Sequence, residues 1–336
     1  MTHEFTGSQP QEPLRTQIEA YIEQRRAWIG DAVELLGGDG SAPWESVLTL
    51  PTQASGEARE NTPELQLDSE HEARLREIAG RFGIGGEQDV TLEQQGLRPG
   101  HVDIKEGGLV WKIAAEAELG SSNAGTIVYA GSPYRRTTDE ERAFQQDVMH
   151  VTPDDIAADQ TEYDVAKLVA TRQPGFEALE QPEVLPFGYA VSEGNPFVAE
   201  PTGQLEKIGT QNGKDVWRLR IDRQVEADGS YRFQPDTATV MRLMAEYLTA
   251  HGDTDTAVGM TTSNTYASRA VDVVRAGLAQ DRPFAVAMYG RQTLASAKHK
   301  PVTAPTDAKQ LPGELAVMAY KLDQLAEAVR NQPQQA

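Results

Sequence analysis

Apolar residues recur every three or four positions along several stretches of the chain, the spacing that places them on one face of a helix. Asp68 is a good N-cap for one of these stretches, and Gly37 and Gly38 end another. The first helix is amphipathic, so its apolar face packs either on the rest of the chain or on a second copy. The sequence does not decide whether the protein forms a homodimer. The helices predicted from this spacing cover 12–36, 68–81, 109–119, 161–171, 237–249 and 312–330.

Short apolar runs between the helical stretches predict buried parallel strands at 126–130, 257–260 and 283–289. The stretch 254–277 joins the second of these strands to a tight polar turn and a further helix. Arg269 lies just inside that helix. This strand–turn–helix unit is the corner around which a ligand site is most plausible, because free backbone N–H groups at a helix N-terminus attract small anions.

The pattern changes from 187 to 233 to short β segments separated by Gly, Asn and Pro. Hairpin signals lie at 211–214 and 227–230. We expect a β-rich insertion, a meander over about 185–234, that either covers a ligand site as a lid or serves as an interaction surface.

Helices that alternate with buried strands indicate the α/β class, with a parallel-sheet core and helices on both faces. We expect residues 1–100 to form a helical N-terminal extension with a linker rich in Pro, Ser, Gly, Thr and Glu. Residues 101–300 would form the α/β core that contains the insertion. Residues 301–336 would form a C-terminal loop, helix and tail.

The composition limits the classes of molecule that the protein is expected to bind. The 336 residues carry a formal net charge of −20, which opposes binding to nucleic acid and to anionic lipid. No apolar run approaches the roughly 18 residues of a membrane span, and the polar N-terminus is unlike a secretory signal, so a cytoplasmic protein is expected. The absence of cysteine excludes thiol nucleophiles, disulfides and Cys-ligated zinc.

The three predicted strands each end in a small, polar or arginine-bearing turn, at 131–136, 261–264 and 290–292. Parallel strands end at the same edge of a sheet, and ligands of such folds bind beyond that edge. The turns are therefore expected to meet in a positive pocket for a small anionic ligand, such as a phosphate, a nucleotide or a carboxylate. Solvated arginines in a surface turn are the alternative for 131–136. The candidate ligand-binding residues are Gly131 and Ser132 for close backbone approach, Thr262, Ser263 and Asn264 for hydrogen bonds, and Arg135, Arg136, Arg269 and Arg291 for charge.

Catalytic signatures are weak. The chain has no G-x-S-x-G elbow, P-loop, H-E-x-x-H or dinucleotide-binding glycine pattern, and its six histidines lack metal-ligand spacing. The acidic runs at 139–141 and 154–155 favour helix starts over metal sites. Whether the protein is an enzyme stays undecided. If it is one, Glu162 and Asp236 are the carboxylates to test as base or metal ligand, although a helix-start role is the simpler interpretation of Glu162.

Several of these residues stand where the DUF218 family has its motifs. The late strand–turn–helix of that family resembles 262–264, 269–270 and 275–278, and its earlier helix and strand resemble 111–119 and 126–132. Glu162 and Asp236–Thr237 lie near two further family positions. Thr265–Tyr266 replaces the usual aromatic–His pair, and Ser132 replaces the last glycine of an S-G-G turn.

The resemblance implies a Rossmann-like α/β fold, an association with envelope functions, and S-adenosylmethionine or a nucleotide as the cofactor to consider. Together with the predicted pocket, the resemblance favours a protein that binds a small anionic or nucleotide-like ligand. Whether it also has hydrolase or transferase activity is undecided. The alternative is a non-catalytic interaction protein that uses the terminal amphipathic helices and the β insertion as its partner surface.

Overall fold

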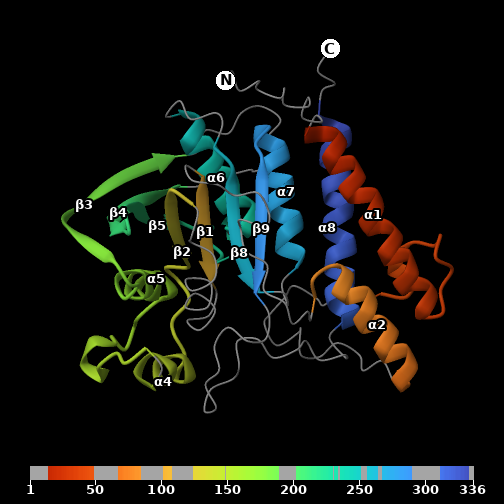
Figure 1. Cartoon of the computed structure of the whole chain (residues 1–336), viewed down its shortest axis with the longest axis horizontal. Coiled ribbons are helices and arrows are strands. Elements are labelled where there is room, and N and C mark those ends of the chain that lie inside the picture. The colour runs from red at the N-terminus through yellow and green to blue at the C-terminus, as the bar shows by residue number, and fades with distance from the viewer. Residues whose placement is uncertain are drawn as a thin grey trace, which may run out of the picture.

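The computed structural model confirms the α/β class, with one mainly parallel sheet between layers of helices (Figure 1). The residues that it describes are 14–48, 67–84, 101–107, 124–147, 149–188, 202–229, 231–233, 235–250, 256–263, 267–289 and 311–332. The predicted helix over 109–119 and the predicted turn over 290–292 lie outside these ranges.

Seven strands form the main sheet in the order β3-β4-β5-β2-β1-β8-β9. The neighbouring strands β5, β2, β1, β8 and β9 run parallel to one another. Strands β3 and β4 are antiparallel to their neighbours. The strands are β1 (Val102–Gly107), β2 (Thr126–Gly131), β3 (Phe176–Gly188), β4 (Thr202–Gln211), β5 (Lys214–Ile221), β8 (Val258–Ser263) and β9 (Phe284–Tyr289).

The β-rich segment belongs largely to this sheet. Its β4 and β5 form a hairpin through a two-residue turn, in which Asn212 and Gly213 take φ angles of 49° and 80°. β5 then pairs with β2, so the segment extends the parallel body. Only β6 (Gln224–Val225) and β7 (Tyr231–Phe233) form a separate two-stranded ribbon among the described residues. The curved β3 and β4 project from one edge of the molecule (Figure 1).

Alternate residues of the strands face opposite helical layers, as the pleat requires. Ile127 and Tyr129 of β2 pack with α5 (Glu162–Thr171) and with Phe144 of α4 (Asp139–Asp147). Val128 and Ala130 of the same strand face a second cluster, which contains α6 (Thr237–Ala250) and part of α7 (Ser268–Gln280). Helices therefore cover both faces of the sheet.

A further layer of helices packs outside α7. It consists of α1 (Leu14–Leu35), α2 (Ser69–Arg81) and α8 (Leu311–Asn331), and its apolar side chains form one core cluster with those of α7. Asp68 caps α2 as predicted, accepting hydrogen bonds from the N–H groups of Glu70 and His71. The apolar faces of the first and last helices are thus buried within the chain. Figure 1 shows α1 and α8 side by side. None of the described helices combines the length and apolar character needed to cross a membrane.

The central strand β1 carries a buried ion pair. Lys105 Nζ lies 2.9 Å from Asp103 Oδ2, and both side chains are 0% exposed. Thr261 on the neighbouring β8 donates a hydrogen bond of 3.0 Å from Oγ1 to Asp103 Oδ1. Burial raises the pKa of Asp103, and the Lys105 ammonium opposes that rise.

The order of the strands changes direction between β1 and β8. From β1 the chain adds β2 and later β5 on one side, and then β8 and β9 on the other. Parallel sheets of this kind bind ligands where the direction of winding changes, beyond the strand ends. β1 and β8 flank this point.

Candidate functional site

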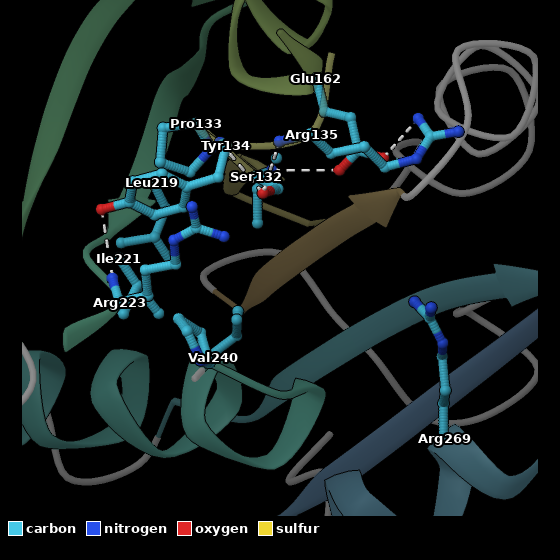
Figure 2. A pocket seen from close by; sticks show the side chains of 13 residues that line it. Ser132, Pro133, Tyr134, Arg135, Glu162, Leu219, Ile221, Arg223, Val240 and Arg269 are labelled. Atoms are coloured by element: carbon cyan, nitrogen blue, oxygen red, sulfur yellow. Dashed lines mark hydrogen bonds and ion pairs between the residues drawn. The ribbon is translucent and has the colours of Figure 1, made fainter. Parts of the chain in front are cut away.

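A cavity of about 390 Å³ opens at the carboxyl end of β2 (Figure 2). One wall comes from the turn after β2 and from the start of α5. The floor comes from the end of β5 and the start of α6, and the first turn of α7 supplies the opposite wall. The lining residues are Ala130, Gly131, Ser132, Pro133, Tyr134, Arg135, Glu162, Leu219, Ile221, Arg223, Pro235, Val240 and Arg269.

The turn after β2 is held by Ser132. Its Oγ accepts hydrogen bonds from the N–H groups of Tyr134 and Arg135, both at 3.2 Å. Its carbonyl oxygen accepts a third from the N–H of Tyr163. These contacts fold the chain back toward α5, so that Tyr134 and Arg135 lie beside the cavity.

Gly131 is needed for packing between two elements of the chain. A Cβ at this position would lie 2.6 Å from the carbonyl oxygen of Glu162, closer than real contacts allow. The glycine therefore lets the end of β2 approach the start of α5. Gly131 also lines the cavity, and its role in the close approach of a ligand stays a prediction.

Glu162 is the first residue of α5, but other side chains cap that helix. Thr161 and Asp164 form the capping box. The Glu162 carboxylate instead turns toward the turn after β2, where the N–H of Ser132 donates a hydrogen bond of 3.2 Å to its Oε2. Only 3% of Glu162 is exposed, yet it lines the cavity. The helix-start interpretation thus gives way to a carboxylate held at the cavity wall.

Arg135 lies between two buried carboxylates. It donates two hydrogen bonds to Glu141 Oε1, at 3.1 and 3.0 Å, and its Nη1 lies 2.7 Å from Glu162 Oε1. Glu141 is also fixed by the N–H of Thr138, which donates to its Oε2 at 2.7 Å. Arg135 was predicted to neutralise a ligand, but its charge is already matched by acidic side chains of its own chain. The three groups together carry one negative charge when both carboxyls are ionised.

The pKa of Glu162 is raised to about 7 from its usual 4.5. Burial is the largest cause, because desolvation disfavours the charged form. The Arg135 guanidinium and the Ser132 N–H oppose the rise, while the nearby Glu141 adds to it. Glu162 therefore exchanges a proton near neutral pH.

Arg269 brings positive charge to the opposite wall. It is the second residue of α7, whose N-cap position is occupied by Ala267 without a side-chain cap. The N-terminal end of a helix carries a partial positive charge that adds to that of a guanidinium. In Figure 2 Arg269 stands across the cavity from Ser132 and Glu162. The cavity thus has a proton-exchanging carboxyl at one side and a cation at the other.

Several lining residues had no signal in the sequence pattern. Arg223 follows β5, and its guanidinium carbon lies 4.2 Å from the centre of the Tyr134 ring. Leu219, Ile221 and Val240 supply apolar surface. Adjacency to the predicted arginine turn was the one available hint for Tyr134. Nothing pointed to Arg223, because its place depends on β5 pairing with β2.

Three predicted residues do not line the cavity. Arg136 is exposed and contributes a backbone bridge to Thr161. Thr262 is fully buried in β8. Asp236 begins α6 instead: its Oδ1 accepts hydrogen bonds from the N–H and Oγ1 of Thr239, at 2.7 and 2.6 Å, so capping accounts for this carboxylate.

The remaining predicted residues fall in the less certain part of the chain. Asn264, Arg291 and the side chain of Ser263 lie outside the described residues. Of the predicted site, the structure brings together Gly131, Ser132, Arg135, Glu162 and Arg269. Within the described ranges, no three His, Asp or Glu side chains are grouped as a metal site would require.

Comparison with known proteins adds no relative. No protein-family model matches the chain, and neither a curated protein nor a solved structure is significantly similar to it.

Proposed function

We propose that the cavity at the carboxyl end of β2 binds a small anionic ligand and that Glu162 exchanges a proton with it. The observation that carries this proposal is a buried carboxyl with a pKa of about 7 on the wall of a 390 Å³ cavity. Carboxyls with a pKa near the working pH are suited to general acid–base catalysis, and strongly shifted pKa values in clefts favour functional sites.

The proposed roles divide between the two walls. Below pH 7 the Glu162 carboxyl donates a proton, and above it the carboxylate accepts one. Arg135 holds this carboxyl in place through the ion pair at 2.7 Å. Arg269 and the N-terminus of α7 attract the anionic group of the ligand. Such an arrangement suits a hydrolase or a transferase, in which a leaving group gains a proton or an attacking hydroxyl loses one.

Binding can be tested with inorganic phosphate, ribose 5-phosphate, adenosine 5′-monophosphate and benzoate, by calorimetry and by thermal unfolding. A probe at a hundred times its Kd should stabilise the protein by about 2.7 kcal/mol. Arg269→Ala should abolish the effect. Arg136→Ala is the matched control, because it removes an exposed arginine that does not line the cavity and should leave binding unchanged.

Two results would contradict the anion site: no binding of any probe, or equal loss of binding in the two arginine variants. The role of Glu162 is tested separately by Glu162→Gln. If Glu162 exchanges a proton with the ligand, wild-type affinity for benzoate, which is ionised throughout this range, should change between pH 6 and pH 8, around the Glu162 pKa of about 7, and the variant should lose that change.

The alternative of an interaction protein has less support among the described residues, where only the edge strand β3 carries two of the exposed large apolar side chains, Leu179 and Val184. The apolar faces of α1 and α8 pack within the chain. Among the described residues, large apolar side chains are exposed only at scattered positions, namely Leu179, Val184, Val225 and Tyr320. Scattered exposure of this kind is ordinary for a protein surface.

A further inference from the structure

The Tyr134 side chain is fixed as a rigid part of the cavity wall. Its hydroxyl donates a hydrogen bond of 3.3 Å to Asp222 Oδ1 and accepts one of 3.2 Å from the N–H of Arg223. Asp222 is itself held by Arg220, whose Nε donates to the same oxygen at 2.8 Å. At the other end, the Tyr134 N–H is bonded to Ser132. Hydrogen bonds at both ends fix the position of the ring, and Arg223 lies over its face.

Arg223 packs against the plane of that ring. Its guanidinium carbon lies 4.2 Å from the ring centre, and both side chains line the cavity. Figure 2 shows Tyr134 and Arg223 side by side with Leu219 and Ile221, across the cavity from Arg269. The wall therefore combines a flat cation, a fixed aromatic ring and apolar surface.

We propose that Tyr134 and Arg223 form a subsite for a planar ring in the ligand. The inference rests on the proposed anion site and narrows its ligand to a planar unsaturated ring joined to an anionic group. The ring would stack on the Arg223–Tyr134 wall while the anionic group meets Arg269. A nucleotide and an aromatic carboxylate share this chemistry.

The chemistry of the wall favours a flat ring over a flexible chain. A guanidinium is planar and weakly hydrated, and it stacks on π systems. Pre-organised aromatic surfaces lose little conformational entropy when a ring stacks on them, and base–aromatic stacking is sequence-tolerant because every base has a π face. The apolar side chains of Leu219 and Ile221 suit the same part of the ligand.

Two matched pairs of probes test the subsite by calorimetry. Adenosine 5′-monophosphate and ribose 5-phosphate share phosphate and sugar, but only the first has a base. The anions benzoate and cyclohexanecarboxylate share a carboxylate, but only the first ring is planar. The planar member should bind about tenfold or more tightly, the range expected for stacking of one ring. The pair that shows the preference identifies the source of the ring.

The variant Arg223→Lys keeps the positive charge and removes the plane, so it should reduce the planar preference to near unity while ribose 5-phosphate still binds. Tyr134→Leu should act in the same direction, and Arg136→Lys is the control that should change nothing. Equal affinity within both pairs, or an unchanged preference in Arg223→Lys, would overturn the ring subsite and leave the anion site standing. Failure of every probe to bind would overturn the anion site, and the ring subsite with it.

Discussion

Two groups of buried charge in this protein differ in balance and in access. Asp103 and Lys105 pair one negative with one positive charge, and neither side chain is exposed. Glu141 and Glu162 share the single guanidinium of Arg135, which is 35% exposed, and Glu162 lines a cavity. The Asp103–Lys105 pair is sealed inside the fold. The second set lies at a cavity wall, where we propose that a ligand reaches the proton of Glu162.

The largest effect is expected when the sealed pair is broken. Lys105→Met would remove the ammonium that lies 2.9 Å from the Asp103 carboxylate, in a fully buried position. Removing one partner of a buried pair costs roughly 3–5 kcal/mol. Urea unfolding should show this loss, and the double variant Lys105→Met with Asp103→Asn should recover much of it. If the single variant is no less stable than the double variant, the pair does not hold Asp103 as described.

A smaller effect on stability, of opposite sign, is expected at the cavity wall, where Glu141 and Glu162 share Arg135. The folded-state pKa of Glu162, about 7, lies above its usual 4.5, so the folded protein binds this proton more tightly than the unfolded chain. The resulting stabilisation is complete below pH 4.5 and is lost as pH rises through 7. A shift of this size corresponds to about 3 kcal/mol.

Glu162→Gln tests that sign, because glutamine has no charge to bury. The variant should be more stable than the wild type at pH 8, by up to about 3 kcal/mol, and similar to it at pH 5. Arg135 keeps Glu141 as its partner in this variant. Thermal and urea unfolding at both pH values measure the difference. The same loss of stability with rising pH in both proteins would show that another group is responsible.

The smallest effect is expected at Asp236, the second carboxylate considered from the sequence. Asp236→Ala removes the N-cap of α6, which costs about 1 kcal/mol. Its ion pair with Arg275 is long, at 3.4 Å, and adds little. Because Asp236 does not line the cavity, the variant should bind the anionic probes as the wild type does. Loss of binding with retained stability would return Asp236 to the site.

The sequence pattern predicted most helices and three strands because their apolar periods are regular. It missed β1, the middle one of the five parallel strands. Val102 and Ile104 face an apolar cluster, but Asp103 and Lys105 alternate with them and are buried as an ion pair. Charged residues in a central strand break the apolar run that marks such strands, and their pairing depends on the finished fold.

The site was predictable in position and less so in its chemistry. The turn after β2 and Arg269 were predicted because parallel strands end at one edge. Glu162 was considered as a carboxylate at the start of a helix and through the family resemblance. The pairing of Arg135 with Glu141 could not be foreseen, since Glu141 also fits the start of a helix. Arg223 joins the wall through the pairing of β5 with β2, a contact between segments distant in sequence. Sequence patterns report local structure, and these contacts are not local.

The most direct test of the raised Glu162 pKa is a carbon-13 NMR titration of the glutamate side-chain carboxyls. The Glu162 signal is assigned by its absence in Glu162→Gln. The Glu162 carboxyl should titrate with a midpoint of about 7, well above the usual 4.5, and the midpoint should move when an anionic probe binds. A midpoint near 4.5, unaffected by any probe, would contradict the claim that Glu162 holds an exchangeable proton at a ligand site.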